Sequence, residues 1–227
     1  MPEVTPRDAA TLILVRNAPR QPEVLLGRRQ TSARFMPGFY VFPGGGIEQD
    51  DYRAGSASEL APELVERAVR VPDIGVDRDY FRAMACAAVR ETVEETGLML
   101  SAPGAVGDGL EGGWTTMHAA GLAPALDTLR YVGRAVTPAD SPIRFHARFF
   151  AASADTLQGD LQPTAELDDV LWVPLSATLD LALASPTRFM LKLMMERGSD
   201  PARFEHRHPT PLFTKTDGQR QVIWDPA

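Results

Sequence analysis

The sequence predicts an α/β fold, because segments with the pattern of buried strands alternate with segments of helical periodicity. Strand patterns occupy residues 10–15, 24–26, 39–42, 129–136, 145–152 and 170–173, and helical patterns occupy 58–70, 79–100 and 179–197. A chain of 227 residues can bury roughly 70 to 75% of its unfolded surface in one core. We expect a single domain over residues 1–227, with an insertion at about 52–78 and a helical C-terminal extension at about 176–227.

The first strands are predicted from short β-rich runs separated by turn residues. Residues 10–15 and 24–26 flank a proline-containing turn, which favours a hairpin. The run 39–42 leads directly into a proline and three consecutive glycines. From about residue 52 to 78 the sequence changes in character, with a helical pattern followed by a loop that contains proline and glycine. We interpret this segment as an insertion.

The helix predicted over residues 79–100 has two distinct sides. At 100° per residue its apolar side chains form a narrow stripe that should face the core. The stripe consists of Cys86, Val89, Val93 and Leu100. Glu91, Glu94 and Glu95 lie on the opposite side, within about 100° of one another. Gly97 predicts that the helix ends or packs closely near that position.

The glycine-rich segment at 104–113 predicts a loop, and the remaining predicted strands and the last helix follow it. Leucines and methionines recur at helical spacing over 179–197, which favours packing against the core. His146, His206 and His208 lack the spacing of metal ligands, so we expect structural or surface roles for them.

Composition and charge exclude several classes of function. A net charge of −7 argues against broad nucleic-acid binding, which depends on Lys and Arg neutralising phosphates. The single cysteine, Cys86, cannot form an internal disulfide, and no apolar run approaches the roughly 20 residues that span a bilayer. We expect a cytoplasmic protein that binds neither nucleic acid nor membrane. A small phosphate-bearing ligand remains compatible with the charge, because a bound cation reverses the local electrostatics.

The segment from residue 90 to 98, RETVEETGL, carries the strongest chemical signal. Its three carboxylates repel one another at spacings of i, i+3 and i+4, so a compensating charge is needed. Mg²⁺ prefers oxygen ligands and completes its shell with substrate phosphates, and Arg90 can orient Glu91. The alternative is a solvated helix face on which Arg90 pairs with Glu94. The whole pattern arises by chance at odds on the order of one in ten thousand, which favours the metal site.

These residues resemble the Nudix box. Residues 90–98 match its second half, Arg-Glu-apolar-x-Glu-Glu-x-Gly-apolar, except that Thr92 replaces an apolar residue. Residues 42–48, FPGGGIE, are similar to its first half. The two halves are nearly contiguous in the standard box, whereas a long insertion separates them here. Asp51 is the nearest equivalent of the box's intervening acidic residue, and the altered spacing weakens any role for it.

The resemblance implies an α/β/α sandwich with a mixed sheet, and Mg²⁺ or Mn²⁺ bound on the helix. By family analogy Glu91, Glu94 and Glu95 are metal ligands or water-activating carboxylates, with Glu95 as a direct ligand. The Gly44 carbonyl is expected to complete the site, and Arg90 to orient Glu91. The chemistry implied is attack of water on one phosphorus of a diphosphate.

A base from a later loop is a further expectation from the family. Glu166 is the candidate, and a solvated acid in a polar loop with Asp168 and Asp169 is an equally good interpretation. The sequence leaves open which glutamate acts as the base.

A second resemblance concerns the substrate. Residues 25–45 are similar to the coenzyme A diphosphatase signature, with Arg29, Arg34 and Gly38 in register and with Gly27 and Gln30 departing from it. The interrupted box is similar to the peroxisomal subgroup, although residues 225–227 are no peroxisomal signal. Arg29 and Arg34 offer forked contacts to phosphate oxygens. The alternative is that one of them lies along the sheet surface and the other makes a structural ion pair.

The function expected from these resemblances is cleavage of coenzyme A or acyl-CoA to 3′,5′-ADP and (acyl-)4′-phosphopantetheine. One alternative is hydrolysis of ADP-ribose or of another nucleoside diphosphate derivative. An alternative of another class is a non-catalytic nucleotide-binding sensor, against which the intact Arg90, Glu91, Glu94 and Glu95 count. The insertion is a candidate lid or homodimer contact.

Overall fold

A nine-stranded mixed sheet forms the centre of the computed structural model, which describes residues 4–33, 35–71, 77–162, 164, 166–204, 208–216 and 219–225. Its main path runs β10-β2-β1-β8-β7-β11-β12, with β3 paired to β2 and β4 paired to β1. The strands are β1 (Arg7–Arg16), β2 (Glu23–Arg29), β3 (Tyr40–Val41), β4 (Gly44–Gly46), β7 (Arg130–Val136), β8 (Phe145–Ser153), β10 (Leu167–Pro174), β11 (Thr210–Thr216) and β12 (Gln219–Asp225). The pairs β1·β8 and β7·β11 are parallel and the others are antiparallel.

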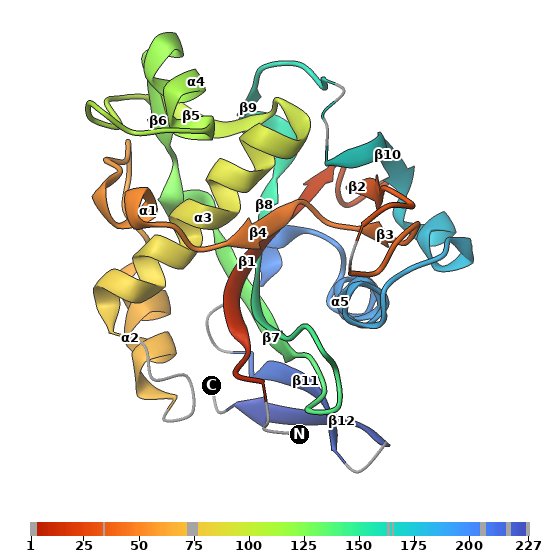
Figure 1. Ribbon diagram of the computed structural model, residues 1–227. Coiled ribbons are helices and arrows are strands. Elements are labelled where there is room, and N and C mark those ends of the chain that lie inside the picture. The colour runs from red at the N-terminus through yellow and green to blue at the C-terminus, as the bar shows by residue number, and fades with distance from the viewer. Residues whose placement is uncertain are drawn as a thin grey trace.

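Helices cover both faces of this sheet, so the predicted α/β/α sandwich is confirmed. Figure 1 shows α3 (Arg78–Thr96) crossing one face and α5 (Ser185–Glu196) lying on the other. Residues alternate between the two faces along a strand. In β1, Leu12 and Leu14 accordingly belong to the core under α3, whereas Ile13 and Val15 belong to the core under α5.

The N-terminal strands form the predicted hairpin, with Val15 opposite Val24. The third predicted strand is shorter than expected and is limited to β3. The glycines after it form β4, which pairs with β1. A Cβ on Gly44 would lie 2.4 Å from the Ala10 carbonyl oxygen, so glycine lets the chain approach β1 closely enough to pair with it.

Helix α3 begins at the N-cap Asp77, whose side chain accepts a hydrogen bond from the Tyr80 amide, and it ends at Thr96. Gly97 is a left-handed C-cap, as predicted. The helix therefore ends earlier than in the predicted range 79–100. The prediction that Leu100 belongs to its apolar stripe is wrong. Leu100 is buried in β5 (Met99–Pro103).

Elements on the α3 side of the sheet enclose that helix almost completely. They are α1 (Gln49–Arg53), α2 (Pro62–Arg70), α4 (Gly113–Ala120) and a small sheet of β5, β6 (Leu122–Pro124) and β9 (Leu157–Gln158). Sequence periodicity did not predict α1 or α4. The insertion helix was predicted from residue 58 and begins at Pro62, a residue well suited to the first turn because it lacks an N–H donor.

The predicted C-terminal extension is helical only in part. The helix predicted over 179–197 is α5, and a 3-10 helix (Leu175–Asp180) precedes it. Residues 210–216 and 219–225 form the antiparallel pair β11 and β12, which extends the sheet instead of adding helix. A buried ion pair between Arg134 and Asp225, with Nη2 and Oδ1 2.9 Å apart, holds this hairpin to β7. No described helix has the length and apolar character needed to cross a bilayer.

Candidate active site

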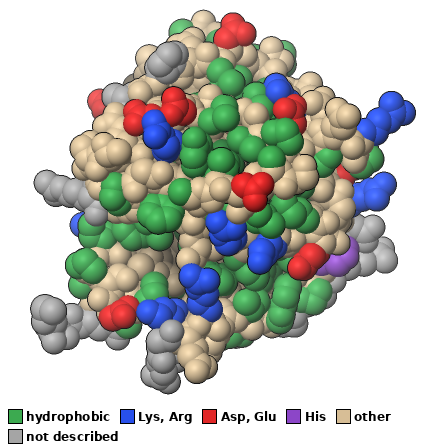
Figure 2. Space-filling view, turned by 90° about the vertical axis from the view of Figure 1, so that its right-hand side faces the viewer, with side chains coloured by type: hydrophobic (Ala, Val, Ile, Leu, Met, Phe, Trp, Pro, Cys, Tyr) green, Lys and Arg blue, Asp and Glu red, His purple; other side chains and the backbone are tan. Residues whose placement is uncertain are grey.

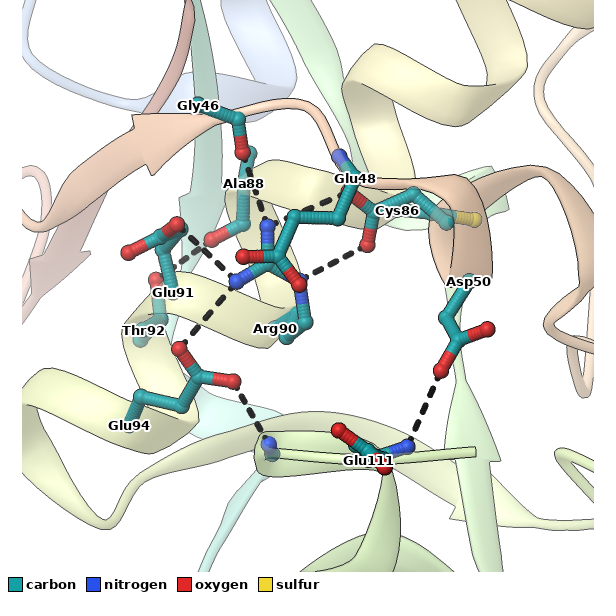
Figure 3. A network of polar contacts seen from close by, with 12 residues as sticks. Gly46, Glu48, Asp50, Cys86, Ala88, Arg90, Glu91, Thr92, Glu94 and Glu111 are labelled. Carbon is teal, nitrogen blue, oxygen red and sulfur yellow. Dashed lines mark hydrogen bonds and ion pairs between the residues drawn. The ribbon is translucent and has the colours of Figure 1, made fainter. Parts of the chain in front are cut away.

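Arg90 is the centre of a buried polar network on α3. Figure 3 shows its guanidinium between the carboxylates of Glu91 and Glu94 and the Gly46 carbonyl. Nη1 donates to Glu91 Oε1 at 2.9 Å and to Glu94 Oε2 at 3.1 Å, and Nη2 donates to the Gly46 oxygen at 2.8 Å. Nε and Nη2 donate to the two oxygens of Asp51 at 2.8 and 3.1 Å. All five N–H groups of the guanidinium therefore have a partner.

Asp51 is more important than the interrupted motif indicated. Its side chain is 0% exposed, and that of Arg90 is 1% exposed. Two buried opposite charges with a forked contact stabilise each other, whereas either one alone would pay a large desolvation cost. Asp51 Oδ2 also accepts a hydrogen bond from the Glu48 amide at 2.8 Å, which closes the first turn of α1. The predicted weak role for Asp51 is wrong, since the insertion begins after it and leaves its position beside Arg90 intact.

Three carboxylates converge beside this network. Glu91, Glu95 and Glu166 each offer an oxygen, and these oxygens lie within 4.8 Å of one another. Glu91 and Glu95 come from successive turns of α3, and Glu166 comes from the segment that leads into β10. This is the one such cluster of His, Cys, Asp and Glu among the described residues.

Burial raises the pKa of Glu91 to about 7 and that of Glu95 to about 8. Desolvation is the largest cause in both, and the neighbouring carboxylates add to it. A hydrogen bond from the Gly44 amide to Glu95 Oε2, 2.8 Å long, acts in the opposite direction. Buried carboxylates that resist ionisation gain most from a nearby cation. Oxygen donors are also what Mg²⁺ and Mn²⁺ prefer, so this set fits a hard divalent ion.

The glycines of β4 leave the space that these carboxylates occupy. A Cβ added to Gly45 would lie 2.3 Å from Glu91 Oε1, which is a severe overlap. At Gly46 an added Cβ would meet no atom within 4 Å. Glycine is therefore required at position 45 because a side chain there would overlap the Glu91 carboxylate, and not because the chain turns.

Glu94 lies apart from the three converging carboxylates. Its Oε1 accepts a hydrogen bond from the Gly113 amide at 2.7 Å, and its Oε2 accepts one from Arg90. Glu94 thus joins the C-terminal half of α3 to the first turn of α4. The i, i+4 pairing with Arg90 that the sequence allowed is present alongside the contact between Arg90 and Glu91.

Arg29 is placed beside the cluster by strand pairing. It lies opposite Leu167, the neighbour of Glu166, in the antiparallel pair of β2 and β10. Its Nε donates to the Phe35 carbonyl at 2.9 Å, and its positive charge lowers the pKa of Glu95 against the larger effect of burial. Arg34, the second arginine of the predicted pair, lies outside the described residues.

The face that carries β2, β3, β10 and α5 on the right of Figure 1 is turned to the viewer in Figure 2. Basic side chains gather near its centre, beside an acidic one and among hydrophobic side chains. A chain with a net charge of −7 therefore offers positive charge locally, which suits a ligand with several phosphate groups.

Comparisons with known proteins identify a common family. No family model matches the chain. A NUDIX hydrolase of Alicyclobacillus acidocaldarius is 32% identical, with a TM-score of 0.61 over 83% of this chain and 90% of that one. The NUDIX domain of Shewanella oneidensis NrtR, crystallised with ADP ribose, is 16% identical with a TM-score of 0.50 over 86% of this chain and 89% of that one, which is a likeness of fold alone.

Curated relatives match a smaller share of their own length. The acyl-coenzyme A diphosphatase NUDT19 of Gallus gallus is 35% identical over 43% of this chain and 33% of its own. A putative nudix hydrolase 7 of Caenorhabditis elegans is 28% identical over 78% of this chain and 55% of its own. The chain thus spans about a third to a half of the length of these two relatives.

Proposed function

The chain belongs to the Nudix hydrolase family, and we propose that it is a divalent-metal-dependent pyrophosphohydrolase that cleaves coenzyme A or an acyl-CoA. The convergence of Glu91, Glu95 and Glu166 beside β4 is the observation that carries this proposal. Three hard oxygen donors in a partly desolvated site suit Mg²⁺ or Mn²⁺. When bound, such an ion would offset charge on the phosphate oxygens and lower the pKa of a bound water.

The reaction requires water to form a new bond to one phosphorus while the bond to the bridging oxygen breaks. A carboxylate of the cluster takes the proton of the attacking water, and the products are 3′,5′-ADP and (acyl-)4′-phosphopantetheine. Arg90 holds Glu91 in place through Nη1 and is itself fixed by Asp51. Glu94 anchors the same end of α3 to α4. These contacts position the cluster before substrate binds, which reduces the cost of ordering it.

Two observations support coenzyme A as the substrate. Relatives at 35% identity are named acyl-coenzyme A diphosphatases. Arg29, which matches the signature of that subgroup, lies at the cluster in β2, and its guanidinium offers Nη atoms for forked contacts to phosphate oxygens. Arg34 completes the proposed pair of substrate contacts. The NUDIX domain of Shewanella oneidensis NrtR was crystallised with ADP ribose, so ADP-ribose is the competing substrate to exclude.

The test is an assay of coenzyme A, an acyl-CoA, ADP-ribose, NADH and a diadenosine substrate, each with Mg²⁺, with Mn²⁺ and with EDTA. Glu95→Gln is the diagnostic variant, because it keeps the size of the side chain and removes its charge. Glu63→Gln is the matched control, since Glu63 is exposed on α2 and is not one of the clustered carboxylates. We expect Glu95→Gln to lower kcat by about 10²- to 10⁴-fold, a range typical of an acid–base group.

The outcomes separate the three functions. Metal-dependent release of 3′,5′-ADP, lost in Glu95→Gln and kept in Glu63→Gln, supports the proposal. Turnover of ADP-ribose with the highest kcat/KM, and indifference to removal of the 3′-phosphate from coenzyme A, would overturn the substrate. No turnover above the level of Glu95→Gln for any of the five compounds would overturn catalysis and leave a nucleotide-binding sensor.

A further inference from the structure

Strand β10, which lies next to β2 in the sheet (Figure 1), is irregular close to the carboxylate cluster. Its pairing with β2 is regular on both sides of one point, where two residues of β10, Asp169 and Val170, stand opposite one residue of β2, Gly27. Such an extra residue is a β-bulge, and bulges beside active sites often re-aim a side chain. Glu166, a member of the cluster, comes three residues before Asp169.

Asp169, the first residue of the bulge, has a left-handed backbone. Its φ is 48°, in a region that most side chains avoid and that glycine enters freely. Of the four described non-glycine residues with positive φ, Asp169 alone lies within a strand. A bulge whose first residue is left-handed normally has glycine there, and aspartate is one of the few other residues that visit this conformation routinely. The backbone preference of residue 169 therefore stabilises the bulge.

An ion pair joins the bulge to the neighbouring strand. Arg28 Nη2 lies 2.6 Å from Asp169 Oδ2, and Arg28 itself stands opposite Asp168 in the ladder, so the pair runs diagonally from β2 to the bulge. The two side chains are 40% and 60% exposed, and an ion pair as exposed as this contributes little to stability. The left-handed backbone of Asp169 is therefore the main feature of the bulge, and the ion pair is secondary.

Gly27, on the opposite side of the ladder, leaves room for the bulged strand. A Cβ added to Gly27 would lie 2.5 Å from Leu167 Cδ1 and 3.0 Å from Leu167 Cβ. The Leu167 side chain, which is 2% exposed, thus occupies the space that a side chain at position 27 would need. Any larger residue at position 27 would displace Leu167, the direct neighbour of Glu166. Gly27 is also one of the two departures from the coenzyme A diphosphatase signature.

The bulge sets the register of the segment that carries the third carboxylate of the cluster. Without the extra residue, regular pairing would place Asp168 opposite Arg29, whereas the observed partner of Arg29 is Leu167. A shift of one residue also exchanges the faces to which successive side chains point, so Leu167 takes the buried position in place of a carboxylate. Glu166 then lies one residue, about 3.3 Å, closer to Arg29 along the ladder. Arg29 is beside the cluster, so the bulge draws Glu166 toward it.

We propose that Asp169 is a positioning residue, whose left-handed conformation holds the bulge in β10 and thereby keeps the Glu166 carboxylate beside Glu91 and Glu95. This inference rests on the proposed function, because it assigns Glu166 to the metal site. Asp169 is not one of the clustered carboxylates, so it acts through the backbone of β10 and not as a ligand. The backbone preference of residue 169, and not its charge, should therefore control the affinity of the cluster for metal.

Substitutions at position 169 separate backbone conformation from charge, with Mn²⁺ affinity measured on the full chain by electron paramagnetic resonance. Glycine and asparagine accept the left-handed conformation without the charge, so Asp169→Gly and Asp169→Asn should bind Mn²⁺ within about twofold of the unmodified protein. Valine, which is branched at Cβ, strongly disfavours this conformation, and Asp169→Val should bind Mn²⁺ about 10-fold more weakly, as loss of a positioning contact typically does.

Asp140→Val is the matched control. Asp140 is also exposed and paired with a cation, Lys215, but it is not among the described residues with a left-handed backbone. This control should leave Mn²⁺ affinity unchanged. Urea denaturation verifies that each variant is folded, and Asp169→Ala, which opposes the left-handed conformation less strongly than valine, should give an intermediate loss of affinity if Asp169→Val does not fold.

A double-mutant cycle with Glu166→Gln tests whether the effect passes through Glu166. Glu166→Gln alone should weaken Mn²⁺ binding, and adding Asp169→Val should cause no further loss, because the residue that the bulge positions has already been changed. A general disturbance of packing would instead weaken binding in both backgrounds.

The outcomes distinguish this inference from the proposed function. Equal losses in Asp169→Gly and Asp169→Val, equal losses in Asp169→Val and Asp140→Val, or additive losses in the cycle would overturn the positioning role and leave the metal site in place. The same holds if Glu95→Gln weakens Mn²⁺ binding and Glu166→Gln does not. Unchanged Mn²⁺ binding in both Glu95→Gln and Glu166→Gln would overturn the metal site, and with it both proposals.

Discussion

The two ends of α3 treat buried polar groups in opposite ways. Near its C-terminus, all five N–H donors of Arg90 are matched by Asp51, Glu91, Glu94 and the Gly46 carbonyl. Near its N-terminus, Arg148 Nε and His146 Nε2 are buried without a partner among the described residues. A completed network holds side chains rigid, whereas a buried polar atom without a partner costs stability. The helix α3 therefore has a fully paired network near one end and an incomplete one near the other.

Removing the Arg90 guanidinium should have the largest effect on stability of the substitutions considered at either end of α3. Arg90→Met leaves Asp51 buried without a counter-charge, and we expect a loss of about 3 to 5 kcal/mol in the free energy of unfolding. Urea denaturation measures it. Arg53→Met is the control, since Arg53 is 55% exposed in its pair with Asp50 and should cost no more than about 1 kcal/mol. Adding Asp51→Asn to Arg90→Met should recover part of the loss. No recovery would contradict the role assigned to Asp51.

Alkaline pH should destabilise the catalytic end of α3 when metal is removed. Burial raises the pKa of Glu91 to about 7 and of Glu95 to about 8 in the folded state, above the ordinary value of 4.5. The folded state therefore holds more protons than the unfolded state, and stability falls as pH rises through these values. In EDTA we expect a loss of about 5 kcal/mol between pH 5.5 and pH 9, with the larger share from Glu95.

Glu95→Gln should flatten this alkaline loss, and Glu63→Gln should follow the unmodified protein. Mg²⁺ should oppose the loss, because it binds the ionised carboxylates of the folded state. An equally steep alkaline loss in Glu95→Gln and the unmodified protein would show that these carboxylates are not its source.

A smaller effect is expected from the glycines of β4. Gly45→Ala should displace the Glu91 carboxylate and lower metal affinity by about 10- to 100-fold, as loss of a positioning contact typically does. Gly46→Ala adds the same methyl group where no atom lies within 4 Å, and its effect should be far smaller. Titration with Mn²⁺, followed by electron paramagnetic resonance, measures both. Similar losses in the two variants would mean that space beside Glu91 does not control the site.

Mild acid should affect the other end of α3. Burial holds the pKa of His146 at about 3, below its ordinary value of 6.5, so the unfolded state takes up the proton first and stability falls as pH drops below 6.5. We expect His146 to account for about 2 kcal/mol of the loss between pH 6.5 and pH 4.5. His146→Gln should remove that part in thermal melts. His118→Gln is the control at an exposed histidine, and an unchanged acid limb in His146→Gln would contradict this assignment.

Much of the fold could be predicted from local pattern. The hairpin of β1 and β2, the strands β7, β8 and β10, and the helices α3 and α5 all have the periodicity or residue types of their class. The C-terminal hairpin was missed, although its strands contain alternating threonine, aromatic and β-branched residues and Asp-Gly stands between them in the sequence. Short elements such as α1 and α4 have too few residues to show a period.

The sequence by itself determined the chemistry of one helical segment, because Arg90, Glu91 and Glu95 lie within six residues and helical geometry alone places them together. Only the tertiary structure brought Asp51 to Arg90 and Glu166 to Glu95. Those contacts join residues far apart in the chain, and no periodic pattern marks them. They depend on how β1, β4 and β10 pair and on where the chain re-enters the fold after the insertion. The packing of the whole sheet decides both.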